Sequence, residues 1–495
     1  MLNKFYLTTT LPYVNSEPHI GFALEIIQAD TIARWQRLND NEVFFNTGTD
    51  EHGLKIYRKA MEEGKEPQEY CDEYAAKFDN LKNALNLSYN NFIRTTDKHH
   101  LKAAQEFWQR CEKNGDIYKK NYQVKYCVGC ELEKTESELE NDKCPIHPNL
   151  ELELINEENY FFRFSKYQQP LLDLYHKNPE FVVPAHRLTE IKNFVAAGLE
   201  DFSISRLKEK MPWGISVPGD ENHVMYVWFD ALINYISCLG WPEDEKKFQE
   251  FWPGCQVAGK DNLRQQSAMW QAMLMSAGLP PSKQIFIHGF ITANGEKMSK
   301  SLGNVINPFE LVKKFGTDAV RYYLLAKISP FEDGDYTEEK FKEAYIADLC
   351  NGLGNLVSRV SNLIEKNDIQ IECHPERLAK DPASFLSSSR TRGSHGFKDD
   401  QLSKSFSEKL ENYKFNEALE ILWNKLRACD ETVTKTEPWK IKDQDRLKEI
   451  LEPIAEDILN VAILLQPFMP ETAEKIKATF TAEKIKKSEP LFPRI

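Results

Sequence analysis

The sequence predicts an α/β protein with a parallel sheet that is split by an insertion and followed by an all-helical region. Short apolar, β-branched runs alternate with helical patterns in residues 1–115 and again in residues 208–335, as in a parallel sheet with crossover helices. Residues 116–207 differ, because short strand-like runs there surround a cysteine cluster. In residues 336–495 the strand-like runs stop and helical patterns dominate. We therefore expect four regions with these limits.

Length and composition fit a globular protein without a membrane segment. The chain has 495 residues, and the usual domain size gives about three domains. The net charge of -13 argues against a protein that coats nucleic acid, so any RNA contact must come from local patches. No apolar run of signal-peptide type precedes the first strand-like segment, and no stretch approaches the about 20 apolar residues of a membrane span. We therefore expect a cytoplasmic protein with no membrane partner.

The chain opens with a predicted strand, loop and helix. Lys4 to Thr10 is a short apolar and β-branched run, and it ends in the breaker-rich loop Leu11 to Ser16. A helix is expected from near His19, because Ser16 and Pro18 give a start signal and one apolar stripe follows. The stripe consists of Ile20, Ala23, Leu24 and Ile27.

Further strands are predicted where short apolar runs recur. They are Val43 to Asn46, Val224 to Phe229, Gln256 to Ala258 and Gln284 to His288. A parallel sheet binds its ligands at the carboxyl ends of its strands. The residues at these predicted ends are Pro12, His19, Asp50, Gly259 and His288. We therefore expect a functional site along this edge.

Three of the ten cysteines cluster and, with one histidine, have the spacing of a zinc knuckle. Cys127, Cys130, Cys144 and His147 form the pattern C-x2-C-x13-C-x2-H, with turn residues inside each close pair. Four such ligands can hold a tetrahedral ion and leave no open position, so the pattern predicts a structural zinc site. The other cysteines are scattered, as expected of reduced thiols in a cytosolic protein. Chance clustering is the alternative.

Lys297 and Lys300 lie in a segment, Lys297 to Ser301, that has the composition of a mobile loop. Asn294-Gly295 before it and Gly303-Asn304 after it are turn formers. Two cations on a mobile loop can neutralise the charge that develops when pyrophosphate leaves an attacked α-phosphate. The alternative is an ordinary surface loop in which both lysines are simply solvated.

The helical region contains three long amphipathic patterns. They cover Ala344 to Lys366, Lys404 to Lys425 and Asp445 to Leu465. Asn355 and Arg359 share one helix face, so they can present an amide and a guanidinium to unstacked bases. Trp439, after Pro438, could stack on such a base. A solvated helix face is the alternative.

In their order along the chain, these motifs resemble those of the class I aminoacyl-tRNA synthetases, and more closely those of the methionyl-tRNA synthetase family. The motifs are Thr10-Leu11-Pro12-Tyr13, Pro18-His19-Ile20-Gly21, Gly48 to Gly53, the cysteine cluster, Val227-Trp228-Phe229-Asp230, Lys297 to Ser301 and Pro438-Trp439. They span nearly the whole chain. The resemblance implies a Rossmann-like catalytic domain in residues 1–115 and 208–335, split by a zinc-knuckle insertion in residues 116–207. It implies an all-helical anticodon-binding domain in residues 336–495.

The resemblance implies that methionine and ATP form methionyl-adenylate, and that the methionyl group is then transferred to the 3′ end of a tRNA with a CAU anticodon. It implies Mg²⁺ with the ATP, and it assigns His19, Lys297 and Lys300 to catalysis. The residues that it assigns to ATP are Pro12, His19, Gly21, Phe22, Gly259, Asp261, His288, Gly289, Lys297 and Lys300. Phe22 departs from the family, which usually has a second histidine there.

The resemblance also implies a methionine pocket and an anticodon site. It places Asp50 at the ammonium group, and around the amino acid it places Leu11, Tyr13, Trp228, Ala231, Leu232, Tyr235, Asn262 and Gln266. An aromatic-lined pocket suits a polarizable thioether, although aromatic residues in an α/β domain are more often plain core residues. Gln266 stands where the family often has a histidine. The implied anticodon residues are Asn355, Arg359 and Trp439, and we expect a monomer.

Two other interpretations are open. One is a class I synthetase for leucine, isoleucine, valine or cysteine. The insertion, residues 116–207, is too short for the large editing domain of the branched-chain enzymes, and the knuckle differs from a substrate-binding zinc site. The other is a degenerate relative that binds tRNA or nucleotide without activating an amino acid. This interpretation is suggested by Phe22, which replaces the second histidine that is usual in the family. Methionine-dependent pyrophosphate exchange separates these interpretations.

Overall fold

A six-stranded parallel sheet forms the centre of the protein. The computed structural model describes residues 3–130, 132–134, 138–298, 303–371 and 396–494. The strand order is β3-β2-β1-β12-β13-β7, and every neighbouring pair is parallel. The strands are β1 (Lys4–Thr9), β2 (Glu42–Thr49), β3 (Asn91–Arg94), β7 (Val182–Val183), β12 (Cys255–Gly259) and β13 (Gln284–His288). The predicted α/β class with a parallel sheet is confirmed.

Side chains of the sheet alternate between two hydrophobic cores. In β1, Leu7 belongs to the first core and Tyr6 to the second. In β13, Phe286 belongs to the first core, whereas Ile285 and Ile287 belong to the second. This alternation follows from the period of two of a β-strand, and strands that are buried on both faces read as nearly continuous apolar runs. The sheet therefore separates two layers of helices.

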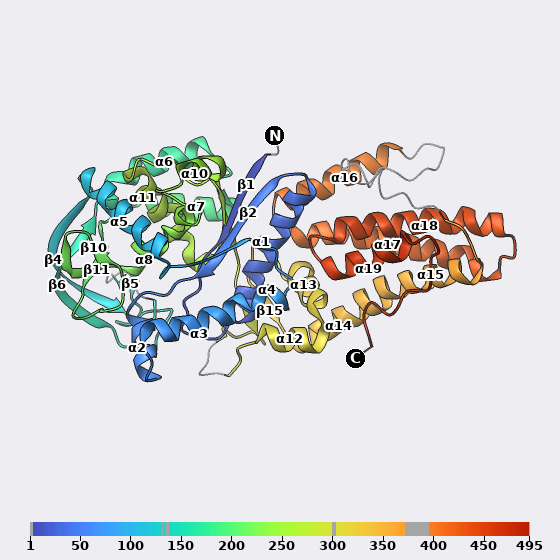
Figure 1. The fold of residues 1–495 in the computed structure, drawn as a ribbon, viewed down its shortest axis with the longest axis horizontal. Coiled ribbons are helices and arrows are strands. Elements are labelled where there is room, and N and C mark those ends of the chain that lie inside the picture. Colours follow the sequence, from blue (N-terminus) through green and yellow to red (C-terminus); the bar gives the residue numbers. More distant parts are fainter. Residues whose placement is uncertain (1–2, 131, 135–137, 299–302, 372–395, 495) are drawn as a thin grey trace.

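Helices cover both faces of this sheet (Figure 1). The first core contains residues of α1 (Ile20–Leu38), α3 (Pro67–Asp79), α12 (Pro308–Phe315) and α13 (Thr317–Ala326), together with the helical region. The second contains residues of α5 (Lys98–Lys113), α6 (Gln168–Lys177), α7 (Ala185–Ala196), α8 (Val227–Ala231), α9 (Asn234–Ser237), α10 (Glu245–Phe251) and α11 (Trp270–Ser276). The short helices α2 (Leu54–Glu62) and α4 (Leu81–Ala84) flank α3 in the sequence. The helix predicted from near His19 is α1, and it packs on β1, β2 and β12.

In the described residues, two antiparallel sheets and a short parallel pair make up the remaining strands. The first sheet has the order β5 (Leu132–Lys134), β4 (Ile117–Cys127), β6 (Glu153–Phe162), β8 (Phe202–Ser203), and the second has the order β10 (Ser216–Val217), β11 (Asp220–Met225), β9 (Ser205–Leu207). The pair is β14 (Ile291–Ala293) with β15 (Gly334–Tyr336). Strand β7 lies within the predicted insertion, residues 116–207, and pairs with β13 at the edge of the main sheet. The limits of the four regions stay predictions.

The predicted strand Val224 to Phe229 is wrong from Tyr226 onward. Strand β11 ends at Met225 and pairs antiparallel with β9 and β10, so it does not belong to the parallel sheet. From Val227 the chain is helical, and the Asp230 N–H donates to the Tyr226 carbonyl oxygen at 3.2 Å. A short, continuous apolar run does not distinguish a buried strand from a buried helix. The conformation was therefore decided by tertiary packing.

The helical region forms an elongated bundle at the opposite end of the molecule from β4 and β6 (Figure 1). It consists of α14 (Glu338–Ala344), a π-helical segment (Tyr345–Gly354), α15 (Asn355–Lys366), α16 (Gly396–Glu411), α17 (Phe415–Thr436), α18 (Gln444–Leu465) and α19 (Pro470–Phe480). The predicted helix Lys404 to Lys425 is two helices, because the chain turns at Tyr413, where φ is 59°. The Tyr413 ring stacks on Phe286 of β13 at a centroid distance of 4.5 Å. No helix of the described residues is both long and apolar enough to cross a membrane.

Candidate functional site

His19 caps the N-terminus of α1 at the carboxyl edge of the sheet. Its backbone is extended, and its Nδ1 accepts a hydrogen bond from the Gly21 N–H at 3.1 Å. Burial lowers the pKa of His19, so the neutral ring carries its proton on Nε2. A Cβ on Gly21 would lie 2.9 Å from the His19 ring, which explains the glycine. The cap therefore combines a ring N–H with a helix N-terminus, and both attract an anion.

The segment that follows the lysine loop, Lys297 to Ser301, is tied to this cap. The backbone N–H of Ile20 donates to the Ile306 carbonyl oxygen at 2.9 Å, which ties the segment after the loop to the first turn of α1. Within the loop, Met298 packs against the first core. Lys297 is exposed, and Lys300 lies outside the described residues. Burial raises the pKa of Asp261, and the charge of Lys297 opposes this rise, so Lys297 lies within electrostatic range of a residue expected at ATP.

Glu25 joins three elements at this edge, although none of the sequence motifs contains it. One oxygen of its buried carboxylate accepts from the Thr10 N–H at 2.8 Å and from the Thr10 hydroxyl at 2.5 Å. The other lies 2.9 Å from Nε2 of His288, whose Nδ1 lies 2.7 Å from the Gly289 carbonyl oxygen. Both ring nitrogens of His288 thus face acceptors and must donate, so the ring is an imidazolium. The signal that could have revealed Glu25 is a lone charge inside the otherwise apolar Ile20 to Ile27 run.

The pKa of His288 agrees with this protonation state. Burial alone would lower it, but the hydrogen bond and charge of Glu25 and the Gly289 carbonyl oxygen raise it above its ordinary value. The pair therefore places a fixed positive charge, balanced by Glu25, at the ends of β1 and β13.

Gly259, Asp261 and His288 meet at the ends of β12 and β13. A Cβ on Gly259 would lie 2.8 Å from an Asp261 carboxylate oxygen and 3.7 Å from the His288 ring. A Cβ on Gly289 would lie 2.2 Å from the Glu332 carbonyl oxygen, so only glycine fits there. Four of the residues expected around ATP therefore lie side by side.

Asp50 and Tyr13 meet where β2 and the loop after β1 leave the sheet. The Asp50 N–H donates to the Pro12 carbonyl oxygen at 3.0 Å, and the Val14 N–H donates to the Asp50 carbonyl oxygen at 3.3 Å. The Tyr13 ring contacts the Trp228 ring edge-on, at a centroid distance of 6.4 Å. These backbone bonds thus hold the buried Asp50 beside the loop that carries Tyr13.

The remaining residues expected around methionine come from three segments. Ala231, Leu232, Tyr235 and Gln266 are buried, Leu11 packs against the second core, and the Asn262 amide lies 3.4 Å from Asp261. The Gln266 amide donates to the Tyr235 hydroxyl oxygen at 2.7 Å. Gln266, which departs from the family, therefore contacts one of the rings expected at the thioether.

Phe22 is part of the apolar face of α1. Its ring contacts the Phe78 ring edge-on, at a centroid distance of 5.4 Å, and packs against the first core. This packing explains why an apolar residue is stable at a position where the family usually has a histidine.

Glu51 anchors the segment that carries Asp50. Its buried carboxylate accepts from Arg94 at 2.6 and 2.9 Å and from the Thr96 hydroxyl at 2.5 Å. A paired and fully hydrogen-bonded carboxylate of this kind is costly to disturb. None of the sequence motifs includes Arg94, which lies on β3.

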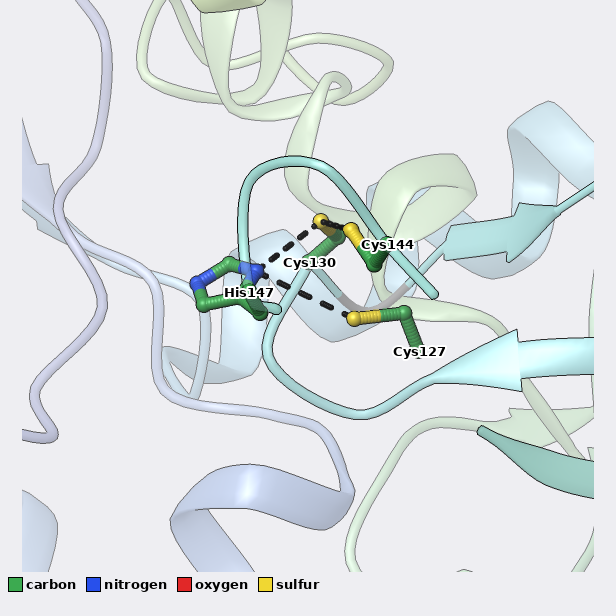
Figure 2. A group of neighbouring side chains, drawn as sticks. All are labelled: Cys127, Cys130, Cys144 and His147. Carbon is green, nitrogen blue, oxygen red and sulfur yellow. Dashed lines mark hydrogen bonds between the residues drawn. The ribbon is translucent and has the colours of Figure 1, made fainter. Parts of the chain in front are cut away.

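The cysteine cluster has the geometry of a metal site (Figure 2). Cys127, Cys130, Cys144 and His147 offer ligand atoms that all lie within 4.8 Å of one another. The Cys130 and Cys144 sulfurs are 3.5 Å apart, and His147 Nδ1 lies 3.2 Å from Cys130 and 3.8 Å from Cys127. A tetrahedral ion with metal–sulfur bonds of about 2.3 Å requires spacings of this size. The cluster could therefore hold a metal ion.

The knuckle is joined by an ion pair to the segment that follows β12. Arg264, which follows β12, forms an ion pair with Glu138 of the knuckle at 2.8 Å. Burial, followed by the charges of Lys55 and Lys297, lowers the pKa of His147. Lys297 is therefore within electrostatic range of the cluster.

Two of the three residues expected at the anticodon meet at the far end of the helical bundle. The Arg359 guanidinium lies 5.8 Å from the centroid of the Trp439 ring and forms an ion pair with Asp430 at 2.6 Å. The Trp439 side chain is 50% exposed. Asn355 is exposed one helical turn before Arg359. An open aromatic ring beside a guanidinium is a surface on which a base can stack.

Comparison with known proteins gives one consistent result. The family model described as tRNA synthetases class I (M) matches residues 5–146 and 129–361. The methionine–tRNA ligase of Synechocystis sp. is 42% identical over 486 residues, which cover 95% of this chain and 88% of that protein. The ligase of Rhizobium meliloti is 43% identical, covering 96% and 91%.

Solved structures agree with the sequence relatives. The Mycobacterium tuberculosis methionyl-tRNA synthetase in complex with methionyl-adenylate has a TM-score of 0.89 and 36% identity, and the match covers 99% of both chains. The apo form of the enzyme from that organism has a TM-score of 0.82 and 32% identity, covering 100% of this chain and 99% of that one. This chain belongs to the class I tRNA synthetases and, within them, to the methionine–tRNA ligase family.

Proposed function

We propose that this ligase binds ATP between the N-terminus of α1 and the ends of β12 and β13, and binds methionine between Asp50 and α8. One observation carries the proposal: residues from separate segments of the chain, which the family motifs assign to the two substrates, converge on one edge of the sheet. The methionine carboxylate attacks the α-phosphate of ATP, giving methionyl-adenylate and pyrophosphate. The methionyl group then passes to the terminal ribose of the tRNA.

The first step needs no protein base, because the methionine carboxylate is already ionised. His19 offers a neutral ring N–H to the phosphates, and the first turn of α1 adds backbone donors. Lys297 and Lys300, together with Mg²⁺ on the ATP, would neutralise the charge that develops on the departing pyrophosphate. Catalysis therefore depends on positioning and on fixed positive charge.

Methionine recognition would combine one charge with an apolar pocket. Asp50 pairs with the ammonium group, and Tyr13 and Trp228 form an aromatic wall that suits a thioether. The hydrogen bond from Gln266 fixes the Tyr235 hydroxyl at the other wall. Gln266 thereby takes the place of the histidine that is usual in the family.

The site residues are tested by the amino-acid dependence of pyrophosphate exchange. Methionine should stimulate exchange above every other amino acid, and Asp50→Asn should raise the methionine KM by about 10- to 100-fold, because a charge-assisted hydrogen bond contributes about 1.5–3 kcal/mol. Asp173→Asn, which changes an exposed carboxylate on α6, is the matched control. Exchange without a preference for methionine would contradict the proposal.

The knuckle would hold a structural zinc ion, since three thiolates and His147 fill all four positions. We expect about one zinc ion per chain in the purified protein, as fits a closed site. Cys130→Ala should release it and lower the midpoint of thermal unfolding, measured by elemental analysis and calorimetry. Cys350→Ala, outside the cluster, should keep the metal. Full zinc retention in Cys130→Ala would refute the assignment.

Recognition of the tRNA would use the end of the helical bundle. The exposed Trp439 ring offers a stacking surface to an unpaired anticodon base, and Arg359 and Asn355 offer hydrogen-bond donors. Asp430, which pairs with Arg359, would hold the guanidinium in place before the tRNA arrives.

A further inference from the structure

A buried hydrogen-bonded chain of four side chains lies behind the proposed methionine site. The Asp230 carboxylate lies 2.6 Å from Nδ1 of His52 through one oxygen and 2.8 Å from Nε2 of His100 through the other. Nδ1 of His100 lies 2.8 Å from the Ser237 hydroxyl. All four side chains are buried. Together they are called the Asp230 chain below.

The charge state of Asp230 fixes the direction of these bonds. Burial alone would raise its pKa, but the charges and hydrogen bonds of His52 and His100 hold the pKa below its usual value. An ionised carboxylate only accepts, so both imidazoles donate to it. The two short contacts are charge-assisted, and such bonds are about twice as strong as neutral ones.

The Asp230 chain joins the elements that carry the proposed methionine residues. His52 follows Asp50 by two positions, Asp230 lies in α8 between Trp228 and Ala231, and Ser237 ends α9, the helix of Tyr235. His100 belongs to α5, which packs against α9 in the second core.

Asp50 needs such a link because two different parts of the chain recognise one small substrate. On one side its backbone is bonded to Pro12 and Val14 in the loop after β1. The wall formed by Trp228 comes from α8, far along the chain. The contact between His52 and Asp230 spans 178 positions of sequence. It fixes the separation between the ammonium-binding carboxylate and the wall of the side-chain pocket.

We infer that His52 is a positioning residue for methionine, acting through Asp230 to hold Asp50 at a fixed distance from α8. The inference rests on the proposed role of Asp50 in methionine binding. The role of His52 is indirect, because it acts through the Nδ1–H that it donates to Asp230. Its loss leaves a buried carboxylate with one donor fewer, so α8 and the Asp50 segment can shift apart.

The expected result is a selective loss of methionine affinity. His52→Gln should raise the methionine KM in pyrophosphate exchange by about tenfold, the equivalent of about 1.4 kcal/mol, and should leave the ATP KM unchanged. His52→Asn should keep most of the methionine affinity that His52→Gln loses, because the asparagine amide nitrogen is bonded to Cγ, as Nδ1 is in histidine. The glutamine nitrogen extends one bond further and misses Asp230.

The matched control is His99→Ala, which removes the exposed neighbour of His100 on the same helix and should change neither constant. An unchanged methionine KM in His52→Gln, an equal rise in the KM of both substrates, or a failure of His52→Asn to rescue would each overturn the inference. If pyrophosphate exchange by the wild type did not depend on methionine, the proposed function would be overturned as well. Wild-type exchange that requires methionine, with no change in His52→Gln, would overturn the inference alone.

Discussion

Lys297→Ala is expected to slow methionyl-adenylate formation by about 100- to 1,000-fold, the usual cost of removing one donor that stabilises charge in a transition state. The loop that bears Lys297 is tied to the N-terminus of α1 through the bond between Ile20 and Ile306. The Lys297 carbonyl oxygen also accepts a hydrogen bond from the Asn304 amide at 3.2 Å. The backbone is thus anchored beside the proposed ATP site, while the side chain stays exposed and able to reach a phosphate.

The measurement is single-turnover adenylate formation at saturating methionine and ATP, compared with tRNA binding. Because the charge on pyrophosphate develops in the transition state, kcat should fall and the ATP KM should change much less. Lys297→Arg should retain part of the rate, since it keeps the charge but changes its geometry. Lys313→Ala, an exposed lysine of α12, serves as the control. Equal losses in adenylate formation and in tRNA binding would contradict a role in activation.

Arg321→Met is expected to lower the free energy of unfolding by about 3–5 kcal/mol, as removal of one partner from a buried ion pair does. Arg321 is fully buried, and its guanidinium lies 2.8 Å from the Asp30 carboxylate. It also donates to the carbonyl oxygens of Phe468, Pro467 and Leu85, at 2.7, 2.8 and 3.1 Å. The substitution leaves one buried charge and three carbonyl oxygens without these donors.

Arg321 connects α1 with the helical bundle. Asp30 belongs to α1, the helix capped by His19, and Arg321 belongs to α13. Pro467 and Phe468 connect α18 with α19 in the helical bundle. The same guanidinium therefore holds the proposed catalytic helix and the helical region together, and its loss should loosen both.

The pH dependence of stability supplies a second measurement. Burial alone would raise the pKa of Asp30, but Arg321, Arg34 and Ser88 hold it below the usual value. A depressed carboxyl pKa contributes stability that is complete above the unfolded value of about 3.9 and is lost as the pH falls through the folded value. The unfolding free energy of the wild type should therefore fall in acid below about pH 4 more than that of Asp30→Asn.

Urea and thermal unfolding provide the comparison, with Arg446→Ala as the control. Arg446 is an exposed arginine of α18 that pairs with Glu449, and its removal should cost at most about 0.5 kcal/mol. The double variant Asp30→Asn/Arg321→Met should lose less than the sum of the single variants, since each partner is costly mainly when it is left alone. Additive losses would show that the two side chains do not act as a pair.

Features with a local cause could be predicted from the sequence. The start of α1 near His19 follows from the signal of Ser16 and Pro18 and from an apolar stripe within two turns, and the structure places the helix cap at His19. The metal ligands were also predictable, because each close pair is held by a turn and the two pairs are near each other in the sequence. The structure brings all four ligand atoms together. In both cases the interacting groups lie within a short stretch of chain.

Features that depend on distant contacts could not be predicted. The run Val224 to Phe229 is apolar or aromatic throughout, so its sequence did not show that it divides between β11 and α8. The amphipathic pattern Lys404 to Lys425 continues through Tyr413, so it does not reveal the break between the two helices there. At this break the Tyr413 ring stacks on Phe286. Both errors concern conformation: a strand was predicted where part of the run is helical, and one helix was predicted where the structure has two.

By itself the sequence determined the α/β class, the family and the residue types that the chemistry requires, because these are written in local periodicity and in short motifs. Tertiary structure alone decided which side chains hold those residues in place. Glu25 and His288 are 263 positions apart, and His52 and Asp230 are 178 positions apart. Such partners carry no spacing signal, since they meet only when the strands take their order in the sheet.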